Sequence, residues 1–314
     1  MRREWKGGLE EIAPNAYAYT QPHGELGVSN AGFLLDNDGG LAVDALLVPS
    51  MTRRFLEAIR KITTRPVSQL INTHHHVDHV GGSFLFEDAQ IISHVHAREE
   101  LLKSGLPPVP ALKQLIPAFA DEYDQLKTAL PQLTFEKRMV IHRANHEAEL
   151  RHLGPAHTFG DALVYLAKEK VVFAGDIAFF QVTPLAYQGH VGSWIKVANR
   201  ILKMDVDIIV PGHGPIGTKR EMLEMRKYLV YLRREAKERF EAGIPAKQAA
   251  REIKLGVYAS WREPERILPN VMRLYQEFQG ELDKALNVFE VFTEMAQLRQ
   301  DIEPGIAHTG HGCL

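Results

Sequence analysis

The apolar residues between positions 28 and 210 gather in short runs that are rich in β-branched side chains and end in turns. Amphipathic segments with helical spacing lie between several of these runs, and this alternation predicts an α/β fold. The predicted strands are residues 31–35, 41–43, 67–72, 90–93, 162–167, 171–174 and 207–210. Segment 161–176 is typical of a β-hairpin, because two apolar runs flank the polar turn Lys168-Glu169-Lys170.

Two stretches depart from this pattern. Residues 97–132 have helical spacing broken by Pro107, Pro108, Pro110 and Pro117, which predicts a helical insertion on the α/β core. From Lys219 onward no strand signal returns, and two apolar stripes favour helices. These stripes are Met222, Met225, Leu229, Leu232, Ala236 and Phe240, and then Val271, Tyr275, Phe278, Leu282, Ala285, Phe289 and Phe292. The second stripe follows Pro269 and is long, so pairing of two chains through it, as a homodimer, is an alternative to packing on its own domain.

We therefore expect a domain at residues 1–218, a helical C-terminal extension at 219–302 and a flexible tail at 303–314.

Composition narrows the class of protein. The 314 residues are 45% hydrophobic and 24% charged, which suits a globular protein with a large core. A net charge of -2 and a pI near 6.7 provide no basic field for nucleic acid, so a small-molecule substrate is the better expectation. The single cysteine, Cys313, allows no intrachain disulfide. We see no secretory signal and no apolar span for a bilayer, and expect a cytoplasmic enzyme without membrane contact.

The strongest chemical signal follows the predicted strand 67–72. There His74, His76, Asp78 and His79 form the pattern H-x-H-x-D-H. In an extended segment, residues i and i+2 project to the same side, so His74 and His76 can hold one ion. Asp78 and His79 lie further along and can reach a second ion. Chance placement would produce this spacing in roughly one chain in a thousand of this composition. The spacing alone leaves open a metal site without catalysis.

Three later segments each place one good ligand at the end of an apolar run, where α/β proteins gather functional residues. His157 lies in Gly-Pro-Ala-His-Thr-Phe-Gly-Asp, Asp176 ends Val-Phe-Ala-Gly-Asp, and His213 lies in Ile-Val-Pro-Gly-His-Gly. Each alone would be an ordinary turn, core or surface residue. In this order after H-x-H-x-D-H they form one constellation.

This constellation resembles the metallo-β-lactamase superfamily over roughly residues 25–218. The resemblance implies an αββα sandwich with the metals at one edge, and a dinuclear hydrolase with two Zn²⁺ per chain. Fe²⁺ or Mn²⁺ are alternatives, since similar nitrogen and oxygen sites accept them. The family's ligand positions assign His74, His76 and His157 to one metal, Asp78, His79 and His213 to the second, and Asp176 to a bridge.

Departures from subfamily patterns narrow the resemblance. Cys313 is terminal, which disfavours the β-lactamases with a cysteine ligand, and His76 stands where di-iron flavoprotein relatives carry Glu. What remains resembles glyoxalase II, lactonases, lactamases without cysteine, cyclase-like hydrolases and hydrolytic dehalogenases.

For these relatives the expected chemistry is attack by a metal-bound hydroxide, oriented or deprotonated by Asp78, on an ester, lactone, cyclic amide or activated aryl halide. The alternatives are a dehalogenase of halogenated aromatics specifically, a metal-dependent cyclase or isomerase, and a binder without catalysis.

Other residues are secondary candidates. Asp44 and Asp161 can accept the second N–H of ligand imidazoles, although a cap or turn explains each equally well. Aromatic residues after Asp176 and apolar residues of the insertion can line a pocket, with core packing as the alternative. These are Phe179, Phe180, Tyr187 and Trp194, and Leu112, Leu115, Ile116 and Phe119. Three further histidine groups are interpreted as surface or tail residues, namely His94 with His96, His142 with His146, and His308 with His311 and Cys313.

Overall fold

The computed structural model describes residues 5–22, 24–37 and 39–302, whose strands form two sheets. In the first sheet β1 to β7 follow one another in chain order, antiparallel from β1 to β4 and parallel from β4 to β7. Their bounds are Gly8–Ala13, Ala16–Thr20, Ala31–Asp36, Gly39–Val43, Val67–Asn72, Gln90–His94 and Leu133–Phe135.

The second sheet has the strand order β12-β11-β10-β9-β8, and only its β11–β12 pair is parallel. The strands are β8 Arg138–His142, β9 Glu147–Arg151, β10 Leu163–Leu166, β11 Val171–Phe179 and β12 Ile208–His213. The predicted hairpin is β10–β11, with Lys170 at φ 55° in its turn. All seven predicted strands are present, and residues 67–72 match β5 at both ends.

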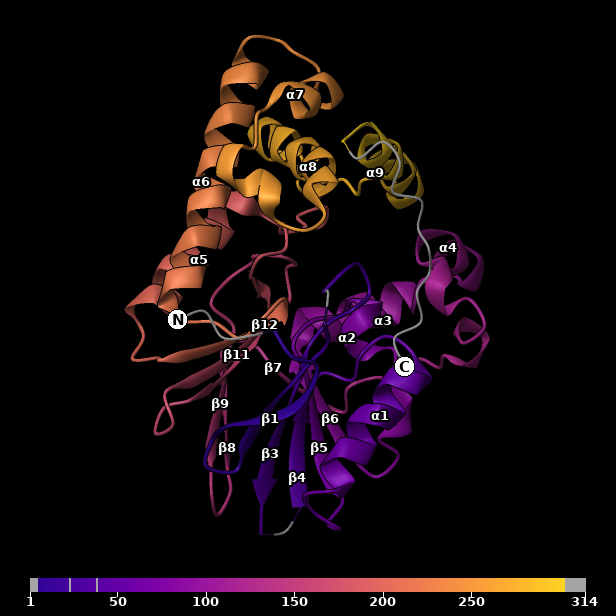
Figure 1. Cartoon of the computed structure of the whole chain (residues 1–314), viewed down its shortest axis with the longest axis vertical. Helices are drawn as coiled ribbons and strands as arrows, with labels where there is room; N and C mark the ends of the chain where they lie inside the picture. Colours follow the sequence, from indigo (N-terminus) through magenta and orange to yellow (C-terminus); the bar gives the residue numbers. More distant parts are fainter. Residues whose placement is uncertain (1–4, 23, 38, 303–314) are drawn as a thin grey trace.

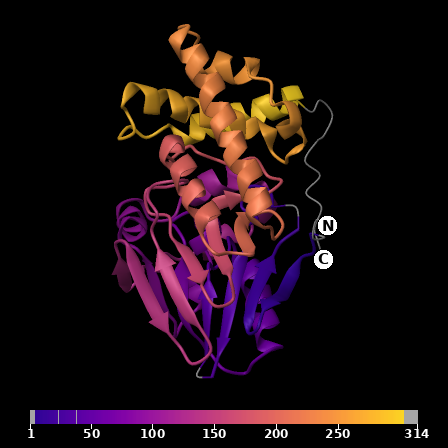
Figure 2. The ribbon, with the colours of Figure 1, turned by 90° about the vertical axis from the view of Figure 1, so that its left-hand side faces the viewer.

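Helices cover the outer faces of both sheets, and a group of helices from the C-terminal part gathers at one end of the molecule (Figures 1 and 2). The helices of the first 213 residues are α1 Pro49–Arg60, α2 Val77–Val80, α3 Val95–Ser104, α4 Val109–Leu115 and α5 Val191–Lys203. The later ones are α6 Lys219–Glu241, α7 Ala246–Glu252, α8 Ile267–Gln279 and α9 Val288–Ile302.

The layers follow from the two-residue period of the strands. In β10, Val164 and Leu166 face the core between the sheets, whereas Leu163 and Tyr165 face the outer core formed with α5 and α6. Since both faces of the central strands are covered, their sequences are continuous apolar runs rather than alternating ones. The predicted αββα sandwich is confirmed.

Several elements were missed or misjudged from the sequence. β1, β2, β7, β8 and β9 were not predicted. β8 is an edge strand whose short apolar run, residues 139–141, lies between the polar residues Arg138 and His142 and is only partly buried. The second C-terminal stripe was expected as one long helix, but it is split between α8 and α9. Gly280, at φ 74°, ends α8 in the left-handed conformation that glycine accepts without strain.

No helix within the described residues is long and apolar enough to cross a membrane. The expected tail, residues 303–314 with His308, His311 and Cys313, lies outside the described residues. The boundary at residue 218 stays a prediction.

Candidate metal centre

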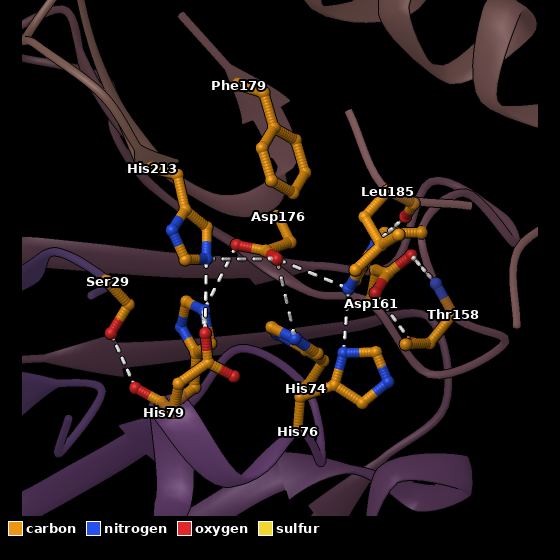
Figure 3. Close-up of polar contacts among 12 residues, drawn as sticks. Ser29, His74, His76, His79, Thr158, Asp161, Asp176, Phe179, Leu185 and His213 are labelled. Atoms are coloured by element: carbon orange, nitrogen blue, oxygen red, sulfur yellow. Dashed lines mark hydrogen bonds and ion pairs between the residues drawn. The ribbon is translucent and has the colours of Figure 1, made fainter. Parts of the chain in front are cut away.

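The structure brings all seven predicted ligand residues together at one edge of the sandwich (Figure 3). His74 and His76 follow β5, and Asp78 and His79 lie in the short helix α2. The other three come from the second half of the sandwich: His157 from the loop before β10, Asp176 from within β11 and His213 from the end of β12.

The first ligand group consists of His74, His76, His157 and Asp176, whose ligand atoms lie within 4.8 Å of one another. His76 Nδ1 is 2.7 Å from His157 Nε2, and His157 Nε2 is 3.2 Å from Asp176 Oδ2. His74 Nε2 lies 4.0 Å from the same oxygen.

The second ligand group consists of Asp78, His79 and His213. His213 Nε2 is 3.2 Å and His79 Nε2 3.8 Å from Asp78 Oδ2. Asp176 faces this group as well, with Oδ1 3.1 Å from His79 Nε2 and Oδ2 3.5 Å from His213 Nε2. Asp176 is therefore placed between the two groups, as a bridging carboxylate must be.

Two glycines allow Asp176 to take this place. Gly175 has φ +50°, and a Cβ at Gly212 on the neighbouring strand would overlap the Asp176 carboxylate. A side chain at either position would displace the carboxylate or strain the backbone.

The buried polar atoms of this centre fit a pair of cations. His74 Nε2, His79 Nε2 and Asp176 Oδ1 are buried and make no hydrogen bond. Leaving such atoms unpaired away from water costs free energy, which a metal ion would recover. Imidazole nitrogens and carboxylate oxygens are the donors that zinc and related divalent metals accept.

In four of the imidazoles, the nitrogen that points away from the metal centre lies within hydrogen-bonding distance of an oxygen. This contact determines which ring nitrogen faces the metal centre. His79 Nδ1 donates to Asp44 Oδ2 at 2.8 Å, and His157 Nδ1 donates to the Leu185 carbonyl at 2.6 Å. His74 Nδ1 lies 3.1 Å from the hydroxyl oxygen of Thr73, which itself donates to Asp44.

His76 Nε2 faces two oxygens, Gln188 Oε1 at 2.7 Å and the Tyr187 hydroxyl at 3.0 Å. With their protons held by these partners, the inward nitrogens of His74, His76 and His157 carry the free lone pairs that a metal needs. His79 Nε2 would offer its lone pair once a bound ion displaced its proton.

Electrostatics separate the two groups. Burial lowers the pKa of His74 and His76 well below the usual value, and that of His157 to about 4. In the second group burial opposes the charged form of His79 and His213, but neighbouring carboxylates outweigh it. They raise the pKa of His79 well above its usual value and that of His213 to about 9. The second group is therefore the more attractive to positive charge.

Of the two carboxylates expected to accept a hydrogen bond from a ligand imidazole, one does so and the other does not. Asp44 holds a ligand imidazole as expected, and it does so at φ 62°. Asp161 does not: its carboxylate accepts from the backbone N–H and hydroxyl of Thr158, at 2.8 and 2.6 Å, and burial raises its pKa to about 7.

The predicted substrate-binding aromatics are corrected in part. Trp194 and Phe180 are at most 1% exposed and belong to the outer core. The Trp194 ring packs behind His157, and its indole N–H donates to the Ile177 carbonyl. Phe179 stacks on His213 with a centroid distance of 5.2 Å. Of these aromatic residues, Tyr187 alone lies beside the ligands with partial exposure, stacked on His76.

Of the insertion residues proposed as a roof, Leu112 is a core residue, and Leu115, Ile116 and Phe119 are partly buried against a core. Leu112 is 2% exposed, and Ile116 packs with it against the outer face of the first sheet. Phe119 packs on the same cluster, and Leu115 packs on the outer core of the second sheet.

Two of the histidines interpreted as surface residues are buried. His94 is 2% exposed and stacks on His152, and His146 is 4% exposed beside Glu169. Their partners in sequence, His96 and His142, are exposed as expected. The described residues place none of these four in a candidate metal cluster.

Gln188, Thr73 and Leu185 were not found from the sequence. Leu185 acts through its carbonyl and could not be found from residue type. Gln188 follows Tyr187 directly, yet a lone glutamine in a loop carries no spacing signal.

Comparison with known proteins places this geometry in context. The family model described as the metallo-beta-lactamase superfamily matches residues 24–213. The alpha subunit of a 2,4-dinitroanisole O-demethylase from Nocardioides sp. (strain JS1661) is 28% identical over 180 residues, which cover 56% of this chain and 49% of that protein. This chain thus matches about half the length of that relative. A metallo-beta-lactamase type 2 from Bacillus sp. (strain 170) is 24% identical over 67% of this chain and 77% of its own.

Among solved structures, the sec-alkylsulfatase Pisa1 from Pseudomonas sp. superposes with a TM-score of 0.65 at 18% identity, covering 87% of this chain and 50% of that one. The DIM-1 metallo-beta-lactamase gives 0.57 at 19% identity, covering 71% of this chain and 96% of its own. At these identities both likenesses concern the fold.

Proposed function

Because this chain belongs to the metallo-β-lactamase superfamily, we propose that it is a dinuclear, zinc-dependent hydrolase of a small, largely uncharged substrate. The observation that carries the proposal is the convergence of seven donor residues, with buried inward atoms that have no hydrogen-bond partner. His74, His76 and His157 would hold one ion and Asp78, His79 and His213 the other, with Asp176 between them.

Bound in this way, two divalent ions would lower the pKa of a water molecule and polarise the substrate's electrophilic carbon. The residues of the chain then have distinct roles. Asp78 is the more open of the two central carboxylates, 14% exposed against 4% for Asp176. Asp78 lies in the second group, where burial would raise its pKa but the imidazoles of His79 and His213 hold it below the usual value, so the carboxylate is ionised at neutral pH. We therefore assign to Asp78 the orientation of the attacking water and the acceptance of its proton.

The substrate class rests on the groups around the ligands. Tyr187 stacks on His76, and Phe292 of α9 packs edge-on against Tyr187 at a centroid distance of 5.5 Å. Burial raises the pKa of the Tyr187 hydroxyl, so it stays neutral and can donate a proton to a substrate oxygen. An aromatic wall with a neutral hydroxyl suits an ester, a lactone, a cyclic amide or an activated aromatic better than a polyanion.

Activated aromatics are the sharper version of this proposal. The relative at 28% identity is named for removing the methyl group of 2,4-dinitroanisole, an aryl ether activated by two nitro groups. Hydrolysis of an activated aryl halide is chemically related, since water attacks a ring carbon made electrophilic by the substituents. Both belong in the same assay.

A hydrolysis panel tests the proposal. It contains an ester, a lactone, a cyclic amide, an activated aryl halide and an activated aryl ether, with a phosphodiester and a secondary alkyl sulfate as charged comparators. We expect turnover within the uncharged set, loss of it after chelation without loss of secondary structure by circular dichroism, and recovery with Zn²⁺. Asp176→Ala prepared in parallel exposes contaminating activity. Preferential turnover of the phosphodiester or sulfate by the intact enzyme alone would contradict the substrate class.

The competing cyclase or isomerase function uses the same ligands without consuming water. Reaction in H₂¹⁸O separates the two, because only hydrolysis incorporates solvent oxygen into the product. A cytoplasmic location, a homodimer through the C-terminal helices and the absence of a nucleic-acid partner remain predictions.

A further inference from the structure

One face of α8 carries a stripe of buried polar residues, in contrast to its apolar stripe. The stripe consists of Arg266, Asn270, Arg273 and Glu277, and Arg266 is the N-terminal cap of the helix. Spacings of four, three and four residues place these side chains along one side of the helix. Arg266, Asn270 and Arg273 are at most 3% exposed. Burying three polar or charged side chains costs free energy unless each makes hydrogen bonds, so the partners of these residues show what the stripe holds in place.

All four residues contact residues 183–192, which we call loop 183–192 and which include the first two residues of α5, and they do so in sequence order. Arg266 donates to the Thr183 carbonyl at 3.0 Å, and Arg273 Nε donates to the Gly189 carbonyl at 2.8 Å. Between them Asn270 donates to the Pro184 carbonyl at 2.8 Å and accepts from the Ala186 N–H at 2.7 Å. Glu277 accepts from the Gly192 N–H at 3.1 Å.

The opposite side of the same loop holds two ligands of the first group. The Leu185 carbonyl accepts from His157, and Gln188 and Tyr187 place their oxygens on His76 Nε2. Hydrogen bonds from α8 hold the backbone of the loop at Pro184, Ala186 and Gly189. The residues that contact the ligands lie between these points in sequence, and they are Leu185, Tyr187 and Gln188. The loop connects the polar stripe of α8 to the first ligand group.

We infer that the polar stripe of α8 is a positioning device for the first metal, acting through loop 183–192. This inference rests on the proposed function, because it assigns His76 and His157 to a metal. Asn270 and Arg273 are the positioning residues, and Gln188 is their contact with the ligand. Among the described residues, the hydrogen bonds from this loop to ligands go to His157 and His76 and not to the second ligand group, so we expect the stripe to act on the first metal and not on the second.

The experiment is a metal titration of the whole chain with Zn²⁺ against a chromophoric chelator, together with the absorption spectrum of the Co²⁺-loaded protein. Asn270→Ala and Arg273→Lys should weaken one of the two binding steps about tenfold and change the Co²⁺ spectrum, leaving the other step unchanged. Gln188→Leu, which removes the contact with His76 directly, should weaken the same binding step and change the Co²⁺ spectrum in the same way. Arg273→Lys keeps the charge and the apolar stem, so it preserves a folded protein for the test if Asn270→Ala lowers stability.

Tyr275→Phe is the matched control. Tyr275 lies on α8 and donates to the Ile244 carbonyl at 2.9 Å, away from the loop. It should leave both binding steps and the spectrum unchanged. The inference is overturned if folded Asn270→Ala and Arg273→Lys titrate like the unaltered protein, or if Tyr275→Phe weakens the same step as much. Failure of the unaltered protein to hold two metals would instead overturn the proposed function on which the inference rests.

Discussion

The two ligand groups of the candidate metal centre differ in what stands behind them. In the first group the outer partners are neutral oxygens, a carbonyl, an amide and two hydroxyls, and burial lowers the pKa of the imidazoles. In the second group the carboxylate of Asp44 backs His79, and three carboxylates raise that imidazole's pKa. Among the described residues, His213 Nδ1 has no hydrogen-bond partner.

The two groups also depend on different parts of the chain. Asp44 follows β4 in the first sheet, whereas the partners of His76 and His157 lie on a loop that α8 fixes from the C-terminal side. The second group attracts a cation by charge, and the first holds neutral imidazoles in place by hydrogen bonds. We therefore expect two binding steps that respond to different substitutions.

The largest effect should come from Asp176→Ala, which removes the residue that both groups share. Both binding steps should weaken, and activity should fall on the order of 10³-fold, since losing the metals forfeits several kcal/mol of transition-state stabilisation. Elemental analysis and kcat/KM measure the two effects. Asp205→Ala, at a surface carboxylate 71% exposed beside Lys170, is the control. Full occupancy of two metals in Asp176→Ala would show that the groups share no bridge.

Asp44→Asn should separate the groups. It keeps the shape of the side chain and tolerates the left-handed backbone at φ 62°, but it removes the charge behind His79. The second binding step should weaken about 10- to 100-fold, and the first less, because Asp44 reaches His74 only through Thr73. Asp161→Asn, at an equally buried carboxylate that holds Thr158, should change neither step. Equal weakening of both steps by Asp44→Asn would contradict the inference that Asp44 supports the second ligand group more than the first.

The ligands and the sandwich could be predicted because each depends on a local pattern. His74 to His79 carry their spacing within six residues, and β5 precedes them as an unbroken apolar run. Asp176 and His213 each end an apolar run, so only their order along the chain was needed to connect them.

What supports the ligands could not be predicted, because it depends on contacts between distant segments. Asn270, in the polar stripe of α8, lies 84 residues from Ala186 in sequence, and the regular spacing of the stripe was hidden by the apolar stripe on the same helix. Phe180 and Trp194 follow Asp176 closely along the chain, but Phe180, directly after β11, and Trp194, on α5, are both buried in the core. Nearness in sequence is therefore a poor guide to which aromatics can meet a substrate.

Tyr187→Phe tests whether the exposed edge of the first group contacts substrate. Gln188 remains as an acceptor for His76 Nε2, so both metal-binding steps should stay within about threefold of their original values. If Tyr187 donates to substrate, KM should rise up to about tenfold, as expected for the loss of one hydrogen bond, with kcat little changed. Steady-state kinetics on the metal-loaded protein measure this. A changed Co²⁺ spectrum with unchanged KM would make Tyr187 a positioning residue instead.

The smallest effect concerns the C-terminal side that supports the first group, and it is a pH dependence of stability. Glu265 lies beside Arg266 in the turn Pro264–Arg266 and is 2% exposed. Burial and then the neighbouring Glu263 raise its pKa from 4.5 to about 6. Because the folded pKa is raised, the folded state binds this proton more tightly than the unfolded state does. The favourable contribution is fully present below pH 4.5, is lost as pH rises to about 6, and is absent at higher pH.

Glu265→Gln should therefore stabilise the protein at pH 7.5 by about 1 kcal/mol, or about 2 °C in Tm, and have no such effect at pH 4.5. Thermal melts of metal-free protein at the two pH values measure the difference, since ligand occupancy then cannot intervene. Glu238→Gln, on the exposed face of α6, is the control and should be neutral at both. A stabilisation that is equal at both pH values would come from packing and not from the buried charge. A gain confined to pH 7.5 would show that ionising the buried Glu265 carboxyl lowers the stability of the folded protein. This cost would then arise beside Arg266, on the side of the molecule that supports the first ligand group, and not at the carboxylates of the second group.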